Sequence, residues 1–392
     1  MRGDDMENAL KVRPEVVGAR LKSARTMSRM TQEAASVALS MARTTIVAIE
    51  AGKRQVAVTE IRAMASLYGV SEVDLLDDGS PSLELTVQFR SSLSESGASD
   101  EVSVAATLNR LANGVIQLEA LLELSPPRID VPYIQLNREE PVEQQAEDAA
   151  LAIRARLGLG MGPIQDLNSI LESELGLRVF ERPLPSRISG AIAMSDVAGA
   201  FVLLNLKHPL YRRRVTAAHE LAHAVLRKSG LTVHFVDESF DDREERFCDA
   251  FGSCLLMPAA AVRKKAAELK QLVGKFTVRE LLTMTLYFNV SMEALVRRMV
   301  ALKLLPAGTF ERLKAGGLGL KHQDVVREEL GLEPEQPSFT ARTMLLALAA
   351  HERELLTEQQ IASMLELDLL AVRKVLDRSR LDGQGARLEL VS

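Results

Sequence analysis

The sequence has no tryptophan, little cysteine and few aromatic residues. Among its 392 residues are 2 cysteines and 6 histidines, and aromatic residues make up 4% of the chain. So little cysteine excludes a small scaffold held together by disulfides. Cys248 and Cys254 both fall on the apolar face of one predicted helix, at a spacing that is poor geometry for a disulfide. We therefore interpret them as reduced core residues.

Long apolar runs are absent as well. No apolar run reaches 18 residues, and the first thirty residues lack the apolar segment of a signal peptide. The sequence is 47% hydrophobic with a net charge of −5. Its length allows about two to three domains with cores of their own. We expect a cytoplasmic protein with no membrane partner.

The most informative pattern that is present pairs two histidines with a glutamate. His219 and His223 lie four residues apart within 215–226, a run of helix formers and buriable apolar residues. Residues at that spacing project within about 40° of each other on an α-helix, so both imidazoles can bind one metal ion while Glu220 lies beside it. The pattern is typical of a zinc hydrolase.

A catalytic zinc normally has three protein ligands and one open position for water, so a third ligand is needed. Segment 241–258 predicts a second helix that is rich in carboxylates. Glu245 and Asp249 are four apart on it, so Glu245 can bind the ion while Asp249 orients a ligand imidazole through its free N–H. Glu244 and Asp242 remain alternative ligands.

The expected reaction is peptide-bond hydrolysis. Zinc lowers the pKa of a coordinated water toward neutrality, and Glu220 would take the proton and pass it to the leaving amide nitrogen. Tyr211, His234 and His208 are the nearby candidates for stabilising the oxyanion, and the sequence does not choose among them. We expect one Zn2+ per chain, although two histidines and a glutamate also accept Mn2+ or another divalent ion.

The two helices together resemble the ImmA/IrrE family of zinc endopeptidases. The resemblance rests on the His-Glu-x-x-His helix followed by the run Glu-Arg-Phe-Cys-Asp-Ala-Phe-Gly-Ser-Cys-Leu-Leu-Met-Pro over 245–258, and it extends over roughly residues 140–306. The family's usual sequence pattern has other residues at Cys248, Asp249 and Gly252. An aspartate at 249 can still orient a ligand imidazole. The resemblance implies a zinc peptidase that cuts a partner repressor, often itself a helix-turn-helix protein, and so releases repressed genes.

Short apolar and β-branched runs at 177–180, 188–194 and 202–206 predict a small sheet beside the histidine-bearing helix. Together with the family resemblance, which implies a zincin-like peptidase, they lead us to expect an α+β domain over 138–306. A substrate peptide could add to the edge of such a sheet as an extended strand.

The amino-terminal part has a different pattern. Between Gly18 and Leu76 it carries five short amphipathic segments, which fit a compact helical bundle. The run Met30-Thr-Gln-Glu-Ala-Ala35 and the run 42–54 resemble the XRE (lambda-repressor-like) helix-turn-helix family. The resemblance implies a DNA-binding domain over 14–78 with 43–50 as the recognition helix.

In that geometry the start of the recognition helix enters the major groove of double-stranded DNA. The side chains expected to face bases or backbone are Gln32, Arg43, Thr44 and Thr45, and those expected to hold phosphates are Lys53 and Arg54. Residues 11–77 carry ten Lys/Arg against seven Asp/Glu, a net of +3. This modest excess suits a homodimer that binds a short operator.

Two residues depart from the usual helix-turn-helix pattern. Ser40 stands where the turn usually has a glycine, at a position where positive φ would cost a non-glycine residue. Ala42 stands where a small capping serine commonly starts the recognition helix. The alternative to a DNA-binding domain is therefore a helix-turn-helix domain that binds another protein instead of DNA.

The remaining segments say less. Residues 79–137 read as a linker followed by an amphipathic helix, whose apolar stripe could form a dimer interface or dock on the peptidase domain. Residues 307–392 predict a helical domain in which 357–376 resembles a second helix-turn-helix. Few basic groups lie on its second helix, which favours a helical cap.

Together these patterns predict a mainly α, multi-domain protein. The hypothesis is a DNA-binding transcription regulator with a zinc endopeptidase domain that cleaves a repressor-type partner. The alternative hypothesis is a DNA-binding repressor whose zincin-like domain senses a ligand or partner without proteolysis.

Overall fold

The computed structural model describes residues 14–27, 30–68, 75, 99–195, 198–227, 230–235, 243–274, 276–316 and 340–382. The chain divides into two compact units, Met1–Val87 and Gln88–Ser392. Residues 79–98 of the predicted linker and, apart from Leu75, the fifth amphipathic segment at 70–76 lie outside the described residues.

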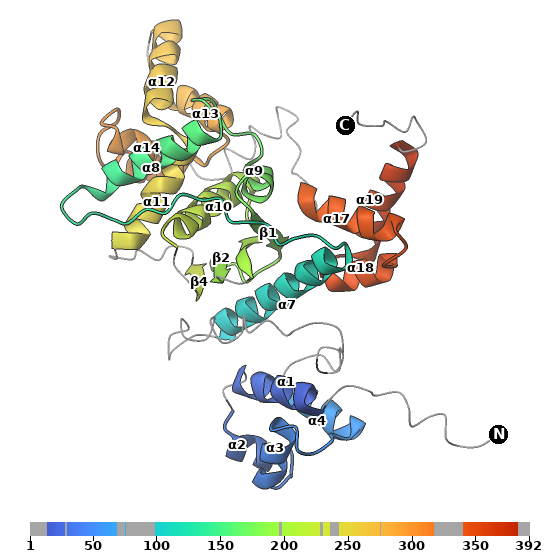
Figure 1. The fold of residues 1–392 in the computed structure, drawn as a ribbon. Coiled ribbons are helices and arrows are strands. Elements are labelled where there is room, and N and C mark those ends of the chain that lie inside the picture. The colour runs from blue at the N-terminus through green and yellow to red at the C-terminus, as the bar shows by residue number, and fades with distance from the viewer. Residues whose placement is uncertain are drawn as a thin grey trace. The chain divides into compact units, whose positions relative to one another are not determined.

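The amino-terminal unit is a helical bundle (Figure 1). Its helices are α1 (Pro14–Met27), α2 (Gln32–Ala38), α3 (Arg43–Glu50) and α4 (Val58–Tyr68). Thr31 caps α2, whereas Ala42 makes no side-chain cap at the start of α3. Ser40 has a φ of 52°, so the turn before α3 requires the positive φ that the sequence led us to expect. The apolar side chains buried in its core include Leu21, Ala35, Ile46, Ile49, Ile61 and Met64.

α1 and α3 approach so closely that their contact requires glycine. A Cβ added at Gly18 would lie 2.2 Å from the carbonyl oxygen of Ile49, well inside van der Waals contact. Gly52 has a φ of 67°, and a Cβ there would lie 2.5 Å from the Cα of Glu15. The crossing of these two helices therefore depends on two residues without side chains.

The larger unit combines a small sheet with many helices (Figure 1). Its helices are α7 (Ser99–Leu121), α8 (Val142–Arg156), α9 (Leu167–Ser173), α10 (Leu210–Val225), α11 (Arg243–Leu256), α12 (Ala259–Val273), α13 (Val278–Phe288), α14 (Met292–Ala301), α15 (Thr309–Ala315), α17 (Ala341–Glu352), α18 (Glu358–Met364) and α19 (Leu369–Asp382). Its strands are β1 (Leu177–Arg182), β2 (Ile188–Ser195), β3 (Gly199–Asn205) and β4 (Gly230–Phe235). The predicted mainly α, multi-domain fold with a small sheet is confirmed.

The sheet is mixed, with strand order β1-β3-β2-β4. β1 pairs with β3 in parallel, while β2 pairs antiparallel with both β3 and β4. Three strands match the runs expected from the sequence, and β4 is an additional edge strand. α10 packs on β2 and β3, and α11 packs between α10 and α8. The core of this unit thus surrounds the helix that carries the two histidines.

The apolar stripe of α7 docks within its own unit. Leu108, Leu111 and Leu118 are fully buried, and α7 contacts β3, β4, α17 and α18. A Cβ at Gly114 would lie 2.0 Å from the carbonyl oxygen of Met364, which shows how closely α18 approaches α7. The stripe is therefore buried within its own unit, against the sheet and against α17 and α18.

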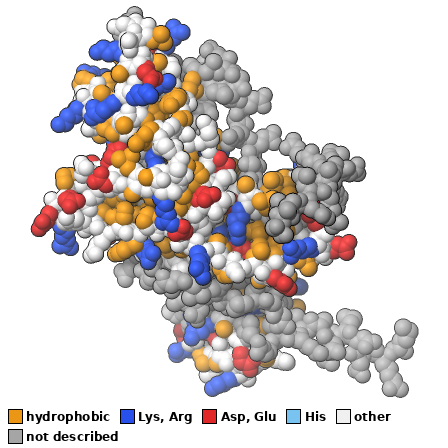
Figure 2. All heavy atoms as spheres, turned by 45° about the horizontal axis from the view of Figure 1, so that its top comes forward, with side chains coloured by type: hydrophobic (Ala, Val, Ile, Leu, Met, Phe, Trp, Pro, Cys, Tyr) orange, Lys and Arg blue, Asp and Glu red, His pale blue; other side chains and the backbone are white. Residues whose placement is uncertain are grey.

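Charged side chains of both signs are interspersed over the face shown in Figure 2, with hydrophobic side chains between them. Among the described residues, no helix is both long enough and apolar enough to cross a membrane.

The α1–α3 crossing yields a stability prediction. Gly18→Ala should weaken the amino-terminal bundle by about 1–3 kcal/mol, because its methyl group would meet backbone that cannot move aside. Hydrogen exchange of the α1 and α3 amides in the full-length chain should accelerate by the corresponding factor. Gly162→Ala is the matched control, because a Cβ there meets nothing within 4 Å. Equal exchange rates of the α1 and α3 amides in the two variants would contradict the close approach of these helices.

Candidate metal centre

The centre begins with two histidines on α10. The helix starts after Pro209, and His219 and His223 project from it one turn apart. His223 is fully buried, as is Glu220, and only a small part of His219 reaches solvent. Small residues on the same helix, such as Ala217 and Ala218, are buried in the core. α10 is thus held between the sheet and α11.

Two glycines let the neighbouring elements come close to α10. A Cβ at Gly252 of α11 would lie 3.2 Å from the backbone nitrogen of His219. A Cβ at Gly190 of β2 would lie 2.7 Å from Cγ2 of Thr216 and 3.1 Å from Oε1 of Glu220. The short distances between these backbones bring carboxylates from α11 to the imidazoles of α10.

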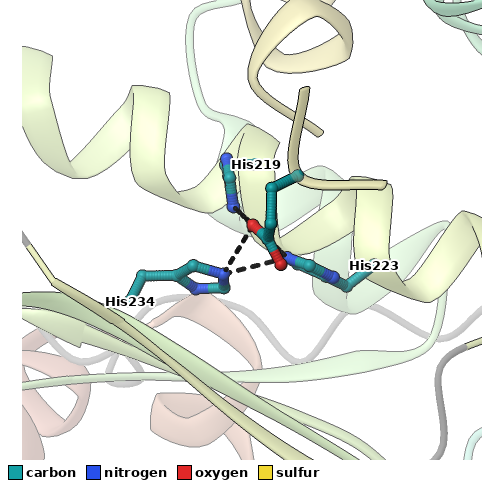
Figure 3. A group of neighbouring side chains, drawn as sticks. His219, His223 and His234 are labelled. Carbon is teal, nitrogen blue, oxygen red and sulfur yellow. Dashed lines mark hydrogen bonds and ion pairs between the residues drawn. The ribbon is translucent and has the colours of Figure 1, made fainter. Parts of the chain in front are cut away.

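Four side chains converge at this place: His219, His223, His234 and Glu245. Each offers one ligand atom, and these atoms all lie within 4.8 Å of one another (Figure 3). The Nε2 atom of His223 lies 3.2 Å from that of His219 and 2.9 Å from that of His234. Oε2 of Glu245 lies 3.4, 3.6 and 3.4 Å from Nε2 of His219, His223 and His234.

The structure therefore brings the three ligands expected from the sequence to one point. Glu245 is buried there, whereas Glu244 is exposed and Asp242 lies outside the described residues. Imidazole nitrogens and a carboxylate oxygen that face one another across 2.9 to 3.6 Å suit a divalent metal ion; zinc prefers such ligands, and Mn2+ also accepts them.

Asp249, which the sequence suggested as the partner of a ligand imidazole, lies beside His219. Its Oδ1 lies 2.9 Å from Nδ1 of His219, so the carboxylate accepts a hydrogen bond from that ring. The bond leaves Nε2 of His219 as the donor atom toward the centre.

Glu220 lies beside the centre, where its carboxylate is hydrogen-bonded to His234. Its Oε1 is 2.8 Å from Nδ1 of His234, and its Oε2 is buried with no hydrogen-bond partner in the part of the chain that the structure describes. His234 comes from β4, and it was expected only among the residues that might stabilise an oxyanion. The structure instead places its Nε2 among the ligand atoms.

The other two oxyanion candidates lie apart from this group. Nε2 of His208 lies 3.2 Å from the carbonyl oxygen of Ser186. Tyr211 is buried about two turns before His219 on α10.

Charge in the centre is strongly coupled. Burial lowers the pKa of His234, but the charge of Glu220 and hydrogen bonds to Glu220 and Glu245 outweigh it and raise that pKa to about 10. Burial raises the pKa of Glu245, but hydrogen bonds from the three histidines outweigh it and hold that pKa far below its usual range. Both shifts arise from the same cause, the direct contact of buried carboxylates with buried imidazoles.

Five of the six residues expected to touch DNA lie at the start of α3 and just after it. Arg43 and Thr44 are exposed and Thr45 is half-buried. Nε of Arg43 lies 3.7 Å from Oε2 of Glu33, an exposed pair. The two residues expected to hold phosphates, Lys53 and Arg54, are also exposed, and Arg54 pairs with Glu60 at 2.9 Å.

Gln32 has a structural contact that the sequence did not reveal. Its Nε2 donates to Oε2 of Glu50 at 2.8 Å, and Arg25 donates to both oxygens of the same carboxylate at 2.5 and 3.0 Å. Arg25 also donates to the carbonyl oxygen of Met30. This buried network ties α1, α2 and α3 together.

Comparison with known proteins finds a domain match within each unit. Residues 172–300 match the family model of the IrrE N-terminal-like domain, a peptidase family, and residues 16–77 match a helix-turn-helix domain. The chain is a fusion of a helix-turn-helix domain with an IrrE-like domain. The IrrE-like match includes the whole sheet, α10 and α11, so it contains all four converging side chains. The resemblance drawn from the sequence is thus confirmed.

No curated protein matches the chain. Among solved structures, ComR from Streptococcus suis aligns over 98% of this chain and 99% of its own, with 10% identity and a TM-score of 0.16. A likeness at that score supports no conclusion about fold or function.

The contact between Asp249 and His219 yields a prediction for the IrrE-like domain. Asp249→Ala should lower zinc affinity by about 10- to 100-fold, because the ring of His219 loses the partner that orients it. Competition with a chromogenic chelator measures the change. Glu244→Ala, an exposed acidic residue on the same helix, should retain the wild-type affinity. Equal affinities of all three proteins would rule out the orienting role.

Proposed function

We propose that this protein is a cytoplasmic DNA-binding transcription regulator whose IrrE-like domain hydrolyses a peptide bond in a partner protein with the help of one zinc ion. The observation that carries the proposal is the convergence of His219, His223 and Glu245 beside Glu220. The peptidase family of the domain supports it.

In this proposal each residue has a defined task. His219, His223 and Glu245 would hold the ion, and Asp249 keeps the ring of His219 in place. When bound, zinc acts as a Lewis acid and lowers the pKa of a coordinated water toward neutrality. Oε2 of Glu220 is buried and unpartnered among the described residues, so it can accept a proton and pass it to the leaving amide nitrogen.

The sheet offers a route for an extended substrate. β4 is at one edge of the sheet, pairs with β2 and carries His234. A peptide that pairs with an edge strand gains main-chain hydrogen bonds, and one added at β4 would run past the metal ligands. The proposed substrate is a segment of a repressor-type protein, in accord with the family resemblance.

The helix-turn-helix domain would bring the enzyme to its site of action. α3 is proposed to enter the major groove of a double-stranded operator, with Arg43 and Thr44 exposed at its start. Lys53 and Arg54 would hold phosphates, and two copies of the chain would read the two half-sites.

A second candidate function is a sensor that regulates transcription without proteolysis. One observation favours it: Glu220 is hydrogen-bonded to His234, whose other nitrogen lies among the ligand atoms. In a centre arranged in this way the metal ligands are in place while Oε1 of Glu220 is engaged by His234.

The peptidase proposal predicts a specific loss of activity. Glu220→Gln should lower cleavage of a partner repressor by about 10²–10⁴-fold, because the amide cannot accept the proton. Zinc content should stay at one ion per chain, since Glu220 is not a proposed ligand. Gel analysis of candidate helix-turn-helix repressors, with metal analysis of each protein, makes the comparison. Cleavage at the wild-type rate by the variant would contradict the mechanism, and bound zinc with no cleavage by either protein would favour the sensor.

The DNA-binding proposal predicts losses confined to the amino-terminal unit. Arg43→Ala should weaken binding to an operator from the protein's own promoter by about 1–3 kcal/mol, because a base or backbone contact is lost. Fluorescence anisotropy at fixed salt measures this. Lys270→Ala, which removes an exposed cation on α12, is the control. Equal binding by wild type and Arg43→Ala would exclude α3 as the reading helix.

A further inference from the structure

His234 occupies the side of the centre where a catalytic zinc site would have its open coordination position for water. It lies on β4 opposite Gly190 of β2, next to a register irregularity between Ile188 and Gly190. Because Gly190 has no side chain, the carboxylate of Glu220 fits between β2 and the imidazole. The local structure therefore holds the ring of His234 against the histidines of α10, as Figure 3 shows.

The distances among the four ligand atoms match one tetrahedral ion. Zinc binds histidine nitrogen at about 2.0–2.1 Å and carboxylate oxygen at about 2.0–2.2 Å, so the donors of a tetrahedral site lie about 3.3–3.5 Å apart. Of the six separations, five lie between 2.9 and 3.6 Å. Three of these five separations involve Glu245, and the shortest, 2.9 Å, joins His223 to His234.

Glu220 is related to His234 as Asp249 is to His219. Each carboxylate meets the Nδ1 atom of its histidine, at 2.8 and 2.9 Å respectively. A carboxylate that accepts the Nδ1 hydrogen fixes the tautomer whose Nε2 lone pair is free for a metal. Both rings then turn Nε2 toward the same point. Glu220 therefore serves His234 as an orienting partner in this arrangement.

We propose that His234 is a fourth protein ligand, so that the IrrE-like domain rests with its metal site closed, and that His234 must leave the ion before a water can take its place. Closed sites with four protein ligands are structural, whereas catalytic zinc sites keep one position open. The same displacement would release Oε1 of Glu220 from its hydrogen bond, so that both oxygens of the carboxylate could face the incoming water. The consequence for catalysis rests on the proposed function, but the ligand assignment does not.

Spectroscopy of the full-length protein loaded with zinc tests the ligand assignment directly. X-ray absorption at the zinc edge should show three imidazoles in the wild type and two in His234→Ala. His234→Ala should also bind zinc at least about tenfold more weakly. His208→Ala is the matched control, because His208 is a buried histidine of the same domain outside the ligand group. It should retain three imidazoles and the wild-type affinity.

Two imidazoles in the wild type would overturn the proposal without recourse to any variant. Equal zinc affinity of wild type and His234→Ala, with cleavage lower in the variant, would assign His234 to oxyanion stabilisation instead. If the proposed function is also right, His234→Ala saturated with zinc should cleave the partner faster than wild type. Three imidazoles in the wild type with no cleavage by either protein would uphold the fourth ligand and reject the peptidase.

Discussion

The close packing of α10 against α11 is the constraint on which the rest of the centre depends. His219 and His223 come from one helix and Glu245 from the other, so a shared ion requires the two backbones to approach. Gly252 makes this possible, since a Cβ there would already press on the backbone of His219. The sheet adds the opposite wall, where Gly190 leaves room for Glu220. Each of these elements packs in the core of the larger unit.

The centre also gathers buried ionisable side chains, whose burial in a protein core is costly unless they are paired. Glu220 and Glu245 are buried within reach of three imidazoles, and each carboxylate contacts at least one of them. Burying such groups is costly unless they pair with one another or bind a metal. One divalent cation could bind all the ligand atoms at once, whereas a proton bonds to a single nitrogen or oxygen. The amino-terminal unit handles buried charge differently, because Arg25 neutralises Glu50 within a closed hydrogen-bond network.

Local spacing explains what the sequence could predict. The four-residue intervals from His219 to His223 and from Glu245 to Asp249 each fix one helical face, and the structure brings these faces together. Ser40 adopts the positive φ expected of the turn before α3. The place of His234 was beyond such reasoning, because it depends on the antiparallel pairing of β4 with β2 and on an irregular register. Its signal in the sequence was only the alternation of apolar and polar residues over 230–235. The contact of Gln32 with Glu50 likewise links residues 18 positions apart.

The most direct test of the account is a crystal structure of the zinc-loaded protein with anomalous data collected at the zinc edge. The account predicts one strong anomalous peak per chain, between the imidazoles of α10 and Glu245 of α11. A peak elsewhere, or none in protein shown by metal analysis to carry zinc, would contradict the claim that this junction is the metal centre.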